Sequence, residues 1–244
     1  MGIDLLGPLQ VDGARPLEPR DRVALTVLAL TPGRVIPPEE FAEAIWGDDA
    51  PSSWPKQVQI CIGRLRKVLG AEAIQTVSGG YRLPVSDDAL DSRRFEQLVT
   101  RAQLLAASGE PDRAASTYLR ALALWRGRPF GDLEDWVPAR SETTRLEEMH
   151  RTAQEDLLEA RLATGEHRQV AVEAEAAVRL EPLRERRWAI LATAQYRGGR
   201  QGDALRSLRT ARRTLRDRLG VDPIASGWML VWSITTIPLG VCQF

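Results

Sequence analysis

The alternation of apolar and polar residues between Ser52 and Val85 predicts a helix followed by a short β-hairpin. Apolar residues recur at i, i+4, i+7 and i+11, which is the period of one buried helix face; they are Val58, Ile62, Leu65 and Leu69. Ser52 or Ser53 can cap this helix, and Pro55 is tolerated in its first turn, where a backbone donor is not needed. The expected strands are residues 74–77 and 81–85, joined by Ser78-Gly79-Gly80, whose glycines allow positive φ.

The opposite face of the same helix is polar and basic. It carries Gln57, Ile60, Arg64 and Lys67. From Ser53 to Val85 the only acid is Glu72, and the basic residues are Lys56, Arg64, Arg66, Lys67 and Arg82. A helix with one apolar and one basic, amide-bearing face suits the major groove of DNA. The spacing alone fits an ordinary surface helix with a solvated charged face better, but the attached hairpin and the helices before it favour DNA binding.

The preceding residues predict a small sheet and two further helices. Residues 3–18 alternate briefly and are interrupted by turn residues, as in two or three short antiparallel strands. A helix is expected over residues 20–30, ended by Thr31-Pro32-Gly33. Its expected inward residues are Val23, Val27, Leu28 and Leu30. Pro38 opens the next helix and Gly47 ends it. The expected packing residues of that helix are Phe41, Ile45 and Trp46.

These segments together carry a family resemblance. The run RLRKVLG, followed shortly by GGYRL, closely resembles the recognition helix and wing of OmpR-type winged-helix domains. Upstream, LALTPGRVIPPEEFAEAIWGDDAP narrows the resemblance to the Streptomyces antibiotic regulatory protein (AfsR/DnrI/RedD) family. The resemblance implies an OmpR-like winged helix-turn-helix domain over residues 1–88. It also implies that the loop over 47–53 is offered to RNA polymerase, with Asp48 and Asp49 as candidate contacts; a solvated loop is the alternative.

The region after residue 88 is predicted to be all-helical, because Ala, Leu, Arg and Glu dominate and β-branched residues are few. It contains a repeated pattern of glycine and small residues at offsets 0, 5, 9 and 12. The three units are Gly109, Ala114, Tyr118, Ala121; Gly165, Val170, Ala174, Ala177; and Gly199, Ala204, Leu208, Ala211. The last two units are 34 residues apart, the tetratricopeptide period. The larger gap before the second unit predicts a lengthened helix over 141–164.

This helical region also carries a resemblance. The run WRGRPFGDLEDWVPARSETTRLEEMHRTAQEDLLEARLATGEH is similar to the bacterial transcriptional activator domain that follows the winged helix in the same regulators. We therefore expect a tetratricopeptide-like domain over residues 89–223. It is either a rigid dimerising or docking body or a peptide-binding groove. A run of arginines on its last helix is expected to be a solvated face, with contact to DNA or an acidic partner as the alternative; these are Arg200, Arg206, Arg209, Arg212, Arg213, Arg216 and Arg218.

Charge and reactive side chains exclude several classes of function. The formal net charge is zero, and residues 1–90 carry nine Lys/Arg against twelve Asp/Glu, so DNA is expected to meet one local basic face. Cys61 and Cys242 form no disulfide framework or zinc spacing, and Cys61 is interpreted as a small packed thiol. His150 and His167 are expected on polar helical surfaces or turns, without a catalytic or metal-binding pattern. No enzyme activity and no cofactor are expected. The first residues lack the features of a signal peptide, so the cytoplasm is the expected location.

The final residues, 224–244, contain no charged side chain and depart from the family pattern. An altered reading frame that gives a non-native end explains the abrupt change best. A packed or frayed terminal segment is the second interpretation. A membrane anchor is the least favoured, because Pro238 and several hydroxyl side chains dilute the apolar run.

The sequence thus predicts a mainly α protein with a small β component that acts as a sequence-specific transcriptional regulator, an activator of a gene cluster. It is expected to bind double-stranded DNA as a homodimer, head to tail on tandem direct repeats, and to contact RNA polymerase. The expected base contacts are Gln57, Ile60 and Arg64; the expected phosphate contacts are Lys56, Arg66, Lys67 and Arg82. The alternatives are a tetratricopeptide adaptor without DNA binding and a truncated, inactive regulator.

Overall fold

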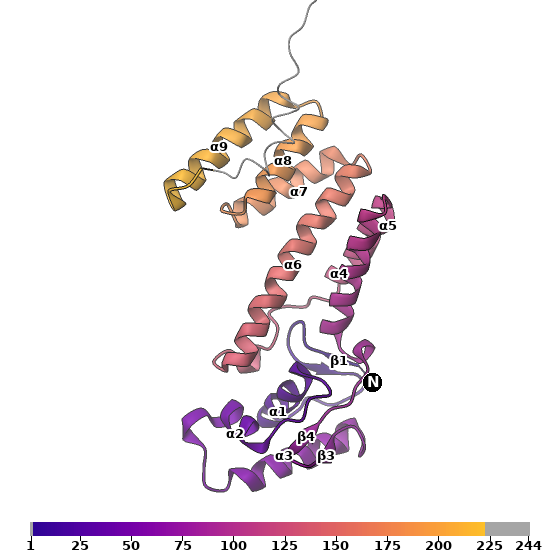
Figure 1. The fold of residues 1–244 in the computed structure, drawn as a ribbon, viewed down its shortest axis with the longest axis vertical. Helices are drawn as coiled ribbons and strands as arrows, with labels where there is room; N and C mark the ends of the chain where they lie inside the picture. The colour runs from indigo at the N-terminus through magenta and orange to yellow at the C-terminus, as the bar shows by residue number, and fades with distance from the viewer. Residues whose placement is uncertain (1, 223–244) are drawn as a thin grey trace, which may run out of the picture. The chain divides into compact units, whose positions relative to one another are not determined.

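The structure is a computed structural model that describes residues 2–222. The apolar end predicted over 224–244 lies outside the described residues. Within them the chain forms two compact units: the first comprises residues 2–101 and 119–151, and the second comprises residues 102–118 and 152–222. Helices dominate both units (Figure 1).

The first unit begins with a small antiparallel sheet. Strands β1 (Ile3–Asp4) and β2 (Gln10–Val11) pair with Ile3 opposite Val11. Ile3 also forms a parallel bridge with Leu90. The backbone N–H groups of Leu5 and Leu6 donate to the Asp91 carboxylate at 2.6 and 3.0 Å, so a buried side chain satisfies backbone donors that the short sheet leaves unpaired.

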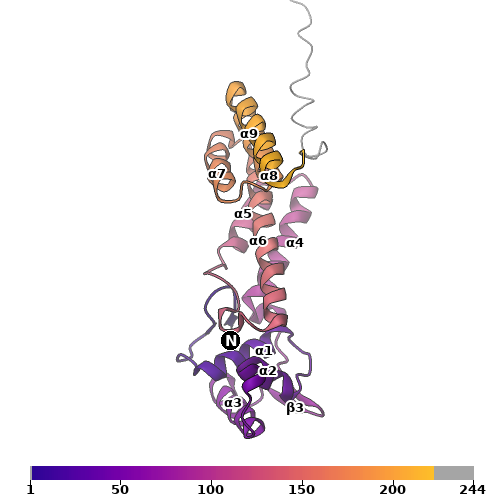
Figure 2. The same cartoon turned by 90° about the vertical axis from the view of Figure 1, so that its left-hand side faces the viewer.

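Three helices follow, α1 (Pro19–Leu30), α2 (Pro38–Trp46) and α3 (Trp54–Leu69) (Figure 2). In α1, Val27 and Leu28 are buried as predicted. Val23 and Leu30, however, are only half-buried, and Ala24 and Leu25 take their inward positions. Residues 24–29 are all buried, so neighbouring elements cover α1 around its circumference, and spacing alone cannot single out one buried face.

The ends of α2 and the burial of α3 follow from the local sequence. Gly47 ends α2 with φ of 57°, a conformation that favours glycine. In α2, Phe41 is fully buried, whereas Ile45 and Trp46 are half-buried. The predicted stripe of α3 is buried throughout: Val58, Ile62, Leu65 and Leu69. Because this stripe packs into the core, the opposite face of α3 must face solvent or a binding partner.

The hairpin is shorter than predicted. Strands β3 (Gln75–Val77) and β4 (Gly80–Arg82) pair with Val77 opposite Gly80, so the turn is Ser78-Gly79. Backbone bonds between Ile36 and Tyr81, at 2.7 and 2.9 Å, tie β4 to the segment before α2. A side chain at Gly80 would meet the Ile36 carbonyl oxygen at 2.0 Å, so glycine is required for this close approach.

The rest of the described chain is helical, as predicted. The short 3₁₀ turns are η1 (Gly47–Asp49), η2 (Asp87–Ala89) and η3 (Gly131–Leu133). The helices are α4 (Asp91–Ala107), α5 (Pro111–Leu122), α6 (Val137–Ala163), α7 (His167–Leu180), α8 (Glu185–Arg197) and α9 (Gln201–Leu219). The lengthened helix expected over 141–164 is α6, which begins four residues earlier, at Val137.

The predicted repeat corresponds to helix pairs. Gly109, Gly165 and Gly199 separate α4 from α5, α6 from α7 and α8 from α9, with φ of 76°, 92° and 79°. Most of the small residues at the repeat offsets are buried, and Ala177 and Leu208 are half-buried. Small buried residues let paired helices approach closely, which is the packing expected of tetratricopeptide-like units.

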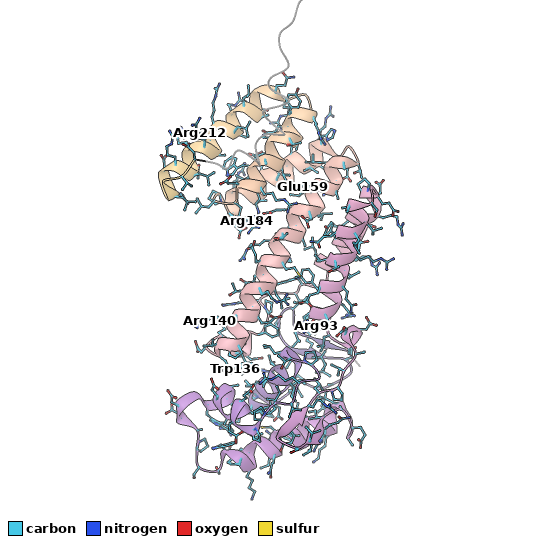
Figure 3. The ribbon with its side chains drawn as sticks, in the orientation of Figure 1. Arg93, Trp136, Arg140, Glu159, Arg184 and Arg212 are labelled. Carbon is cyan, nitrogen blue, oxygen red and sulfur yellow. The ribbon has the colours of Figure 1, made fainter. Side chains whose placement is uncertain are left out.

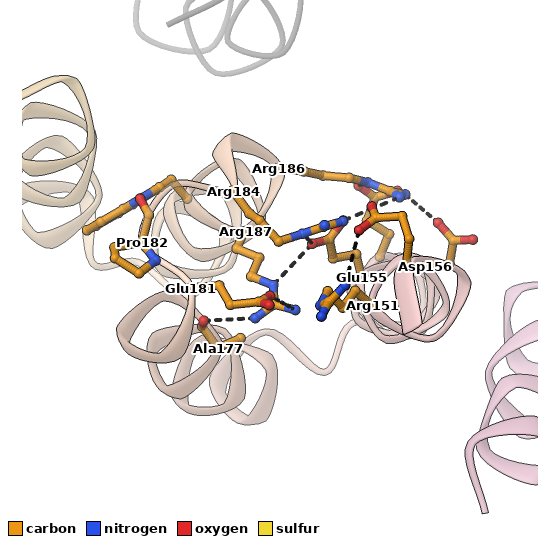
Figure 4. Close-up of polar contacts among 12 residues, drawn as sticks. Arg151, Glu155, Asp156, Ala177, Glu181, Pro182, Arg184, Arg186 and Arg187 are labelled. Atoms are coloured by element: carbon orange, nitrogen blue, oxygen red, sulfur yellow. Dashed lines mark hydrogen bonds and ion pairs between the residues drawn. The ribbon is translucent and has the colours of Figure 1, made fainter. Parts of the chain in front are cut away.

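The second unit combines an apolar core with a buried ion-pair network. Its apolar core includes Leu158, Val170, Trp188, Leu191 and Ala211. The network, shown in Figure 4, centres on the Glu155 carboxylate of α6. Arg184 Nε lies 2.6 Å and Arg187 Nε 3.1 Å from Glu155 Oε1. Arg187 also donates to the Ala177 carbonyl at 3.0 Å and pairs with Glu181 at 2.7 Å. These contacts join α6 to the end of α7 and the start of α8.

The prediction that His150 lies on a polar helical surface or turn is wrong. Its ring lies in an aromatic cluster of the first unit, with its centroid 4.2 Å from that of Trp125 and 6.4 Å from that of Phe95. The Phe95 and Trp125 rings meet edge to face at 5.5 Å. His150 therefore packs on aromatic side chains instead of facing only polar surroundings. His167 is the first residue of α7.

Candidate nucleic-acid interface

The candidate interface is the exposed face of α3, which we call the groove face: Lys56, Gln59, Ile60, Arg64 and Lys67. All five residues are exposed. Ile60 is 48 % exposed although it is a large apolar side chain in the middle of a well-packed helix. The buried stripe on the other side of α3 fixes the direction of this face, and the hairpin follows directly after the helix.

Arg64 extends from the groove face and is held by a buried carboxylate of α1. Its Nε and Nη2 atoms donate to the two Asp21 oxygens, both at 2.8 Å. The Arg64 side chain is 44 % exposed and the Asp21 side chain only 4 %. The hydrogen bond to Asp21 raises the pKa of the guanidinium, so Arg64 is always charged. Its Nη1 atom donates to no group among residues 2–222.

Cys61 lies beneath this ion pair. Its thiol is 3.7 Å from Arg64 Nη2, and the residue is 1 % exposed. Burial, with a further contribution from Asp21, raises the pKa of Cys61 to about 11. The thiol is therefore neutral at physiological pH, as expected for a packed side chain.

Gln57 is engaged within the protein. Its Nε2 donates to Ser53 Oγ at 3.0 Å, and its Oε1 accepts from Arg20 Nη1 at 2.7 Å. The Arg20 guanidinium also stacks 5.3 Å above the Trp46 ring. Ser53 is the N-cap residue of α3 but its side chain makes no cap hydrogen bond, so the predicted capping role is wrong: its hydroxyl is used by Gln57.

Gln59 was not among the predicted contacts. Its side chain is exposed on the groove face and makes no hydrogen bond with the described part of the chain. Its position next to Ile60 and one turn from Lys56 was visible in the helical spacing. What the sequence did not show is that Arg20 and Ser53 occupy the amide of Gln57 and leave that of Gln59 open.

Two of the expected phosphate contacts brace the hairpin. Arg66 donates from Nε and Nη2 to the Ile74 carbonyl, at 2.9 and 2.7 Å, and from Nη2 to Thr76 Oγ1 at 2.7 Å. Arg82 donates to Gln75 Oε1 at 2.6 Å across the hairpin. Lys56 and Lys67, in contrast, are exposed and form no ion pair within residues 2–222.

The remaining sequence candidates lie on exposed surface. Asp48 and Asp49 are exposed in η1, directly after α2. At the start of α9, Arg200, which precedes the helix, and Arg206 both pair with Asp203. Toward its end, Arg212 (labelled in Figure 3) and Arg216 pair with Asp222. Three other exposed arginines of the same helix form no ion pair with the described residues: Arg209, Arg213 and Arg218.

Within residues 2–222 no cluster of three or more His, Cys, Asp or Glu side chains is placed to hold a metal ion. No helix in this range is both long and apolar enough to span a bilayer.

Comparison with known proteins identifies the family. Residues 13–83 match the family described as "Transcriptional regulatory protein, C terminal", and residues 90–226 match "Bacterial transcriptional activator domain". The chain is 31 % identical to regulatory protein DnrI of Streptomyces peucetius over 240 residues, which is 92 % of this chain and 88 % of DnrI. It is 34 % identical to transcriptional regulator RedD of Streptomyces coelicolor over 233 residues, 91 % of this chain and 66 % of RedD. The chain therefore belongs to the Streptomyces antibiotic regulatory protein family of transcriptional regulators.

A solved structure supports the same assignment. Mycobacterium tuberculosis EmbR, determined in complex with a low-affinity phosphopeptide, superposes with a TM-score of 0.89 at 32 % identity, covering 96 % of this chain and 64 % of that one. The predicted fold class, a winged helix followed by an all-helical region, is confirmed. Some relatives are much longer: regulatory protein AfsR of Streptomyces griseus is 34 % identical over 223 residues, which is 90 % of this chain but 23 % of AfsR.

Proposed function

We propose that the chain is a sequence-specific DNA-binding regulator that activates a gene cluster from the cytoplasm. In this proposal, residues 1–88 form the DNA-binding domain, and residues 89–223 form a domain for self-association and for contact with the transcription machinery. The groove face of α3 supports the proposal most directly. It combines exposed Lys56 and Lys67 with the exposed apolar Ile60 and an outward Arg64, on a helix whose other face is buried. An exposed isoleucine between cations suits a helix in the major groove, where it can meet a thymine methyl group.

The individual contacts follow from the chemistry of the groove face. Arg64 is proposed to contact guanine and Ile60 a thymine methyl group. Lys56 and Lys67 are proposed phosphate contacts, because both ammonium groups are exposed and unpaired within the described residues. Gln57 can contact a base only if it exchanges its bonds to Arg20 and Ser53.

Arg66 and Arg82 are proposed as secondary phosphate contacts. Their guanidinium groups hold the hairpin, so any phosphate contact must use the donors that the hairpin leaves over. Asp48 and Asp49 are the proposed contact with RNA polymerase, since both are exposed in the turn before α3.

Binding experiments with two single variants test this assignment. Arg64→Ala should lose roughly 1–3 kcal/mol on the preferred site and relax the preference at one base pair. Lys56→Ala should weaken binding to preferred and shuffled sequences alike and lower the salt dependence, because a phosphate contact carries no sequence information. Fluorescence anisotropy with labelled duplexes measures both. If Arg64→Ala changes neither affinity nor preference, the proposed groove assignment is wrong.

We further propose that two protomers bind head to tail on direct repeats spaced about one helical turn, ~10–11 bp, apart. The stretch around α3 contains no heptad pattern that would impose a two-fold axis on the DNA-binding domains. Inserting about half a turn, ~5 bp, between the repeats should abolish cooperative binding, because one protomer would then face the opposite side of the duplex. Selection of inverted repeats would contradict this arrangement without contradicting DNA binding.

An adaptor role is the second candidate, favoured by a pocket in the second unit. The pocket has a volume of about 400 Å³, and its lining includes Tyr118, Asp156 and Glu159. Tyr118 donates to Asp156 at 3.1 Å, and Arg186 pairs with both acids at 2.6 and 2.7 Å. A chain that binds no DNA but retains a peptide at this pocket would support the adaptor role.

A further inference from the structure

We infer that Asp21 is a positioning residue for base reading: it holds Arg64 side-on and thereby directs the free edge of the guanidinium toward a guanine. This inference rests on the proposed DNA-binding function. It concerns a residue of α1, outside the recognition helix, that would determine specificity without touching DNA.

The first support is the geometry of the pair. Both oxygens of Asp21 accept from one edge of Arg64, Nε and Nη2, at equal distances of 2.8 Å. Such a two-point contact fixes the plane of the guanidinium as well as its position. The Asp21 side chain is 4 % exposed and that of Arg64 is 44 % exposed. The carboxylate therefore lies in the protein interior, and the guanidinium lies at the surface.

The second support is the set of donors that remain. A guanidinium has five N–H donors in a fixed fork. Asp21 accepts from Nε and Nη2, and Nη2 also lies 3.7 Å from the Cys61 thiol, whereas Nη1 donates to nothing among residues 2–222. Guanine presents two acceptors, N7 and O6, to the major groove, whereas adenine presents one acceptor and one donor. An arginine that is oriented in advance meets the two guanine acceptors with less loss of side-chain freedom and cannot easily turn to suit adenine.

The third support is that the arrangement is costly unless both partners stay in place. A buried carboxylate without its counter-charge is strongly unfavourable. Arg64 therefore cannot leave Asp21 entirely on binding DNA, and the pair is expected to act as a unit. A rival explanation is that the pair only joins α1 to α3. That explanation predicts lower stability for variants but no change in the ranking of DNA sequences.

The experiment uses the full chain and four variants. Asp21→Asn removes the charge and keeps the shape; Arg64→Ala removes the contact; Arg64→Lys keeps the charge but not the fork; and the double variant combines Asp21→Asn with Arg64→Ala. Glu18→Gln is the matched control, because Glu18 is an exposed acid that precedes the same helix. Dissociation constants are measured by anisotropy on the selected site and on every single-base variant of it. Thermal unfolding of each protein is recorded alongside.

The expected result is a loss confined to one base pair. The intact chain should prefer G·C there by about 5- to 150-fold, and Asp21→Asn should reduce that preference at least about fivefold while preferences elsewhere stay. Adding Asp21→Asn to Arg64→Ala should remove no further preference, since Asp21 acts only through Arg64. Glu18→Gln should behave as the intact chain.

Three results would overturn the inference. They are an unchanged preference in Asp21→Asn, a uniform loss of affinity over all sequences, and a stronger G·C preference in Asp21→Asn, which would mean that Asp21 sequesters Arg64. If Asp21→Asn fails to fold, Arg64→Lys decides: retention of the intact preference by this variant shows that the fork held by Asp21 is not used. If the intact chain selects no DNA sequence at all, the proposed function itself fails.

Discussion

Removing the charge of Glu155 should destabilise the second unit far more than removing that of Glu159. Both side chains lie on α6 and both pair with arginines of α8, but the Glu155 side chain is 2 % exposed and that of Glu159 is 48 % exposed. Arg187, which pairs with Glu155, is itself buried, at 5 %. Glu155→Gln therefore leaves a buried guanidinium with less counter-charge, whereas Glu159→Gln leaves Arg186 partly exposed to water and still paired with Asp156 at 2.6 Å.

The magnitudes follow from burial. Breaking a buried ion pair by removing one partner costs about 3–5 kcal/mol. Arg187 keeps Glu181 at 2.7 Å and the Ala177 carbonyl at 3.0 Å, so we expect the lower end, about 3 kcal/mol. A half-exposed pair is worth under about 1 kcal/mol, and this is the expectation for Glu159→Gln.

Urea unfolding followed by circular dichroism measures the difference. With an m-value of roughly 1–3 kcal/mol/M, a loss of about 3 kcal/mol lowers the midpoint by roughly 1–3 M. Equal midpoints for the two variants would refute the reasoning, because burial would then not distinguish the two carboxylates. A loss confined to Glu159→Gln would refute it more strongly.

Two further predictions concern the first unit. Arg66→Ala should lower the melting temperature and weaken binding to all DNA sequences alike, because the hairpin loses the hydrogen bonds from α3 to Ile74 and Thr76. Thermal unfolding and anisotropy measure the two effects. A change in base preference would contradict this prediction. Cys61 should resist alkylation in the folded chain at neutral pH and react on unfolding, as followed by peptide-resolved mass spectrometry, and labelling of the folded chain at the rate of a free thiol would contradict its burial. Because folding raises the pKa of this thiol from 9.0 to about 11, its contribution to stability is full below pH 9 and is lost as the pH rises toward 11.

The sequence alone predicted those elements whose buried residues follow a single regular spacing. The buried face of α3 follows from four apolar residues at helical spacing, and its predicted members are all buried. The helix pairs separated by glycine were also predictable, because a glycine and small residues recur at the same offsets in three units. Where a helix packs on two neighbours, as α1 does, spacing alone chose Val23 and Leu30 in place of Ala24 and Leu25.

Pairings between distant residues were not predictable from the sequence. Asp21 and Arg64 are 43 positions apart, and Arg20 reaches Gln57 across 37. Whether an exposed-looking arginine is free or held depends on which carboxylate the tertiary fold brings beside it. The same limit applies to His150, whose helical spacing gave no sign of Trp125 or Phe95.

The central claim is that the groove face reads a DNA sequence, and selection of genomic fragments by the full chain tests it most directly. Bound fragments are recovered, sequenced and compared for the intact chain and Arg64→Ala at one salt concentration. We predict a recurring site for the intact chain and the same site with one G·C position relaxed for the variant. Fragments recovered without any common sequence, or identical sites for both proteins, would contradict the account.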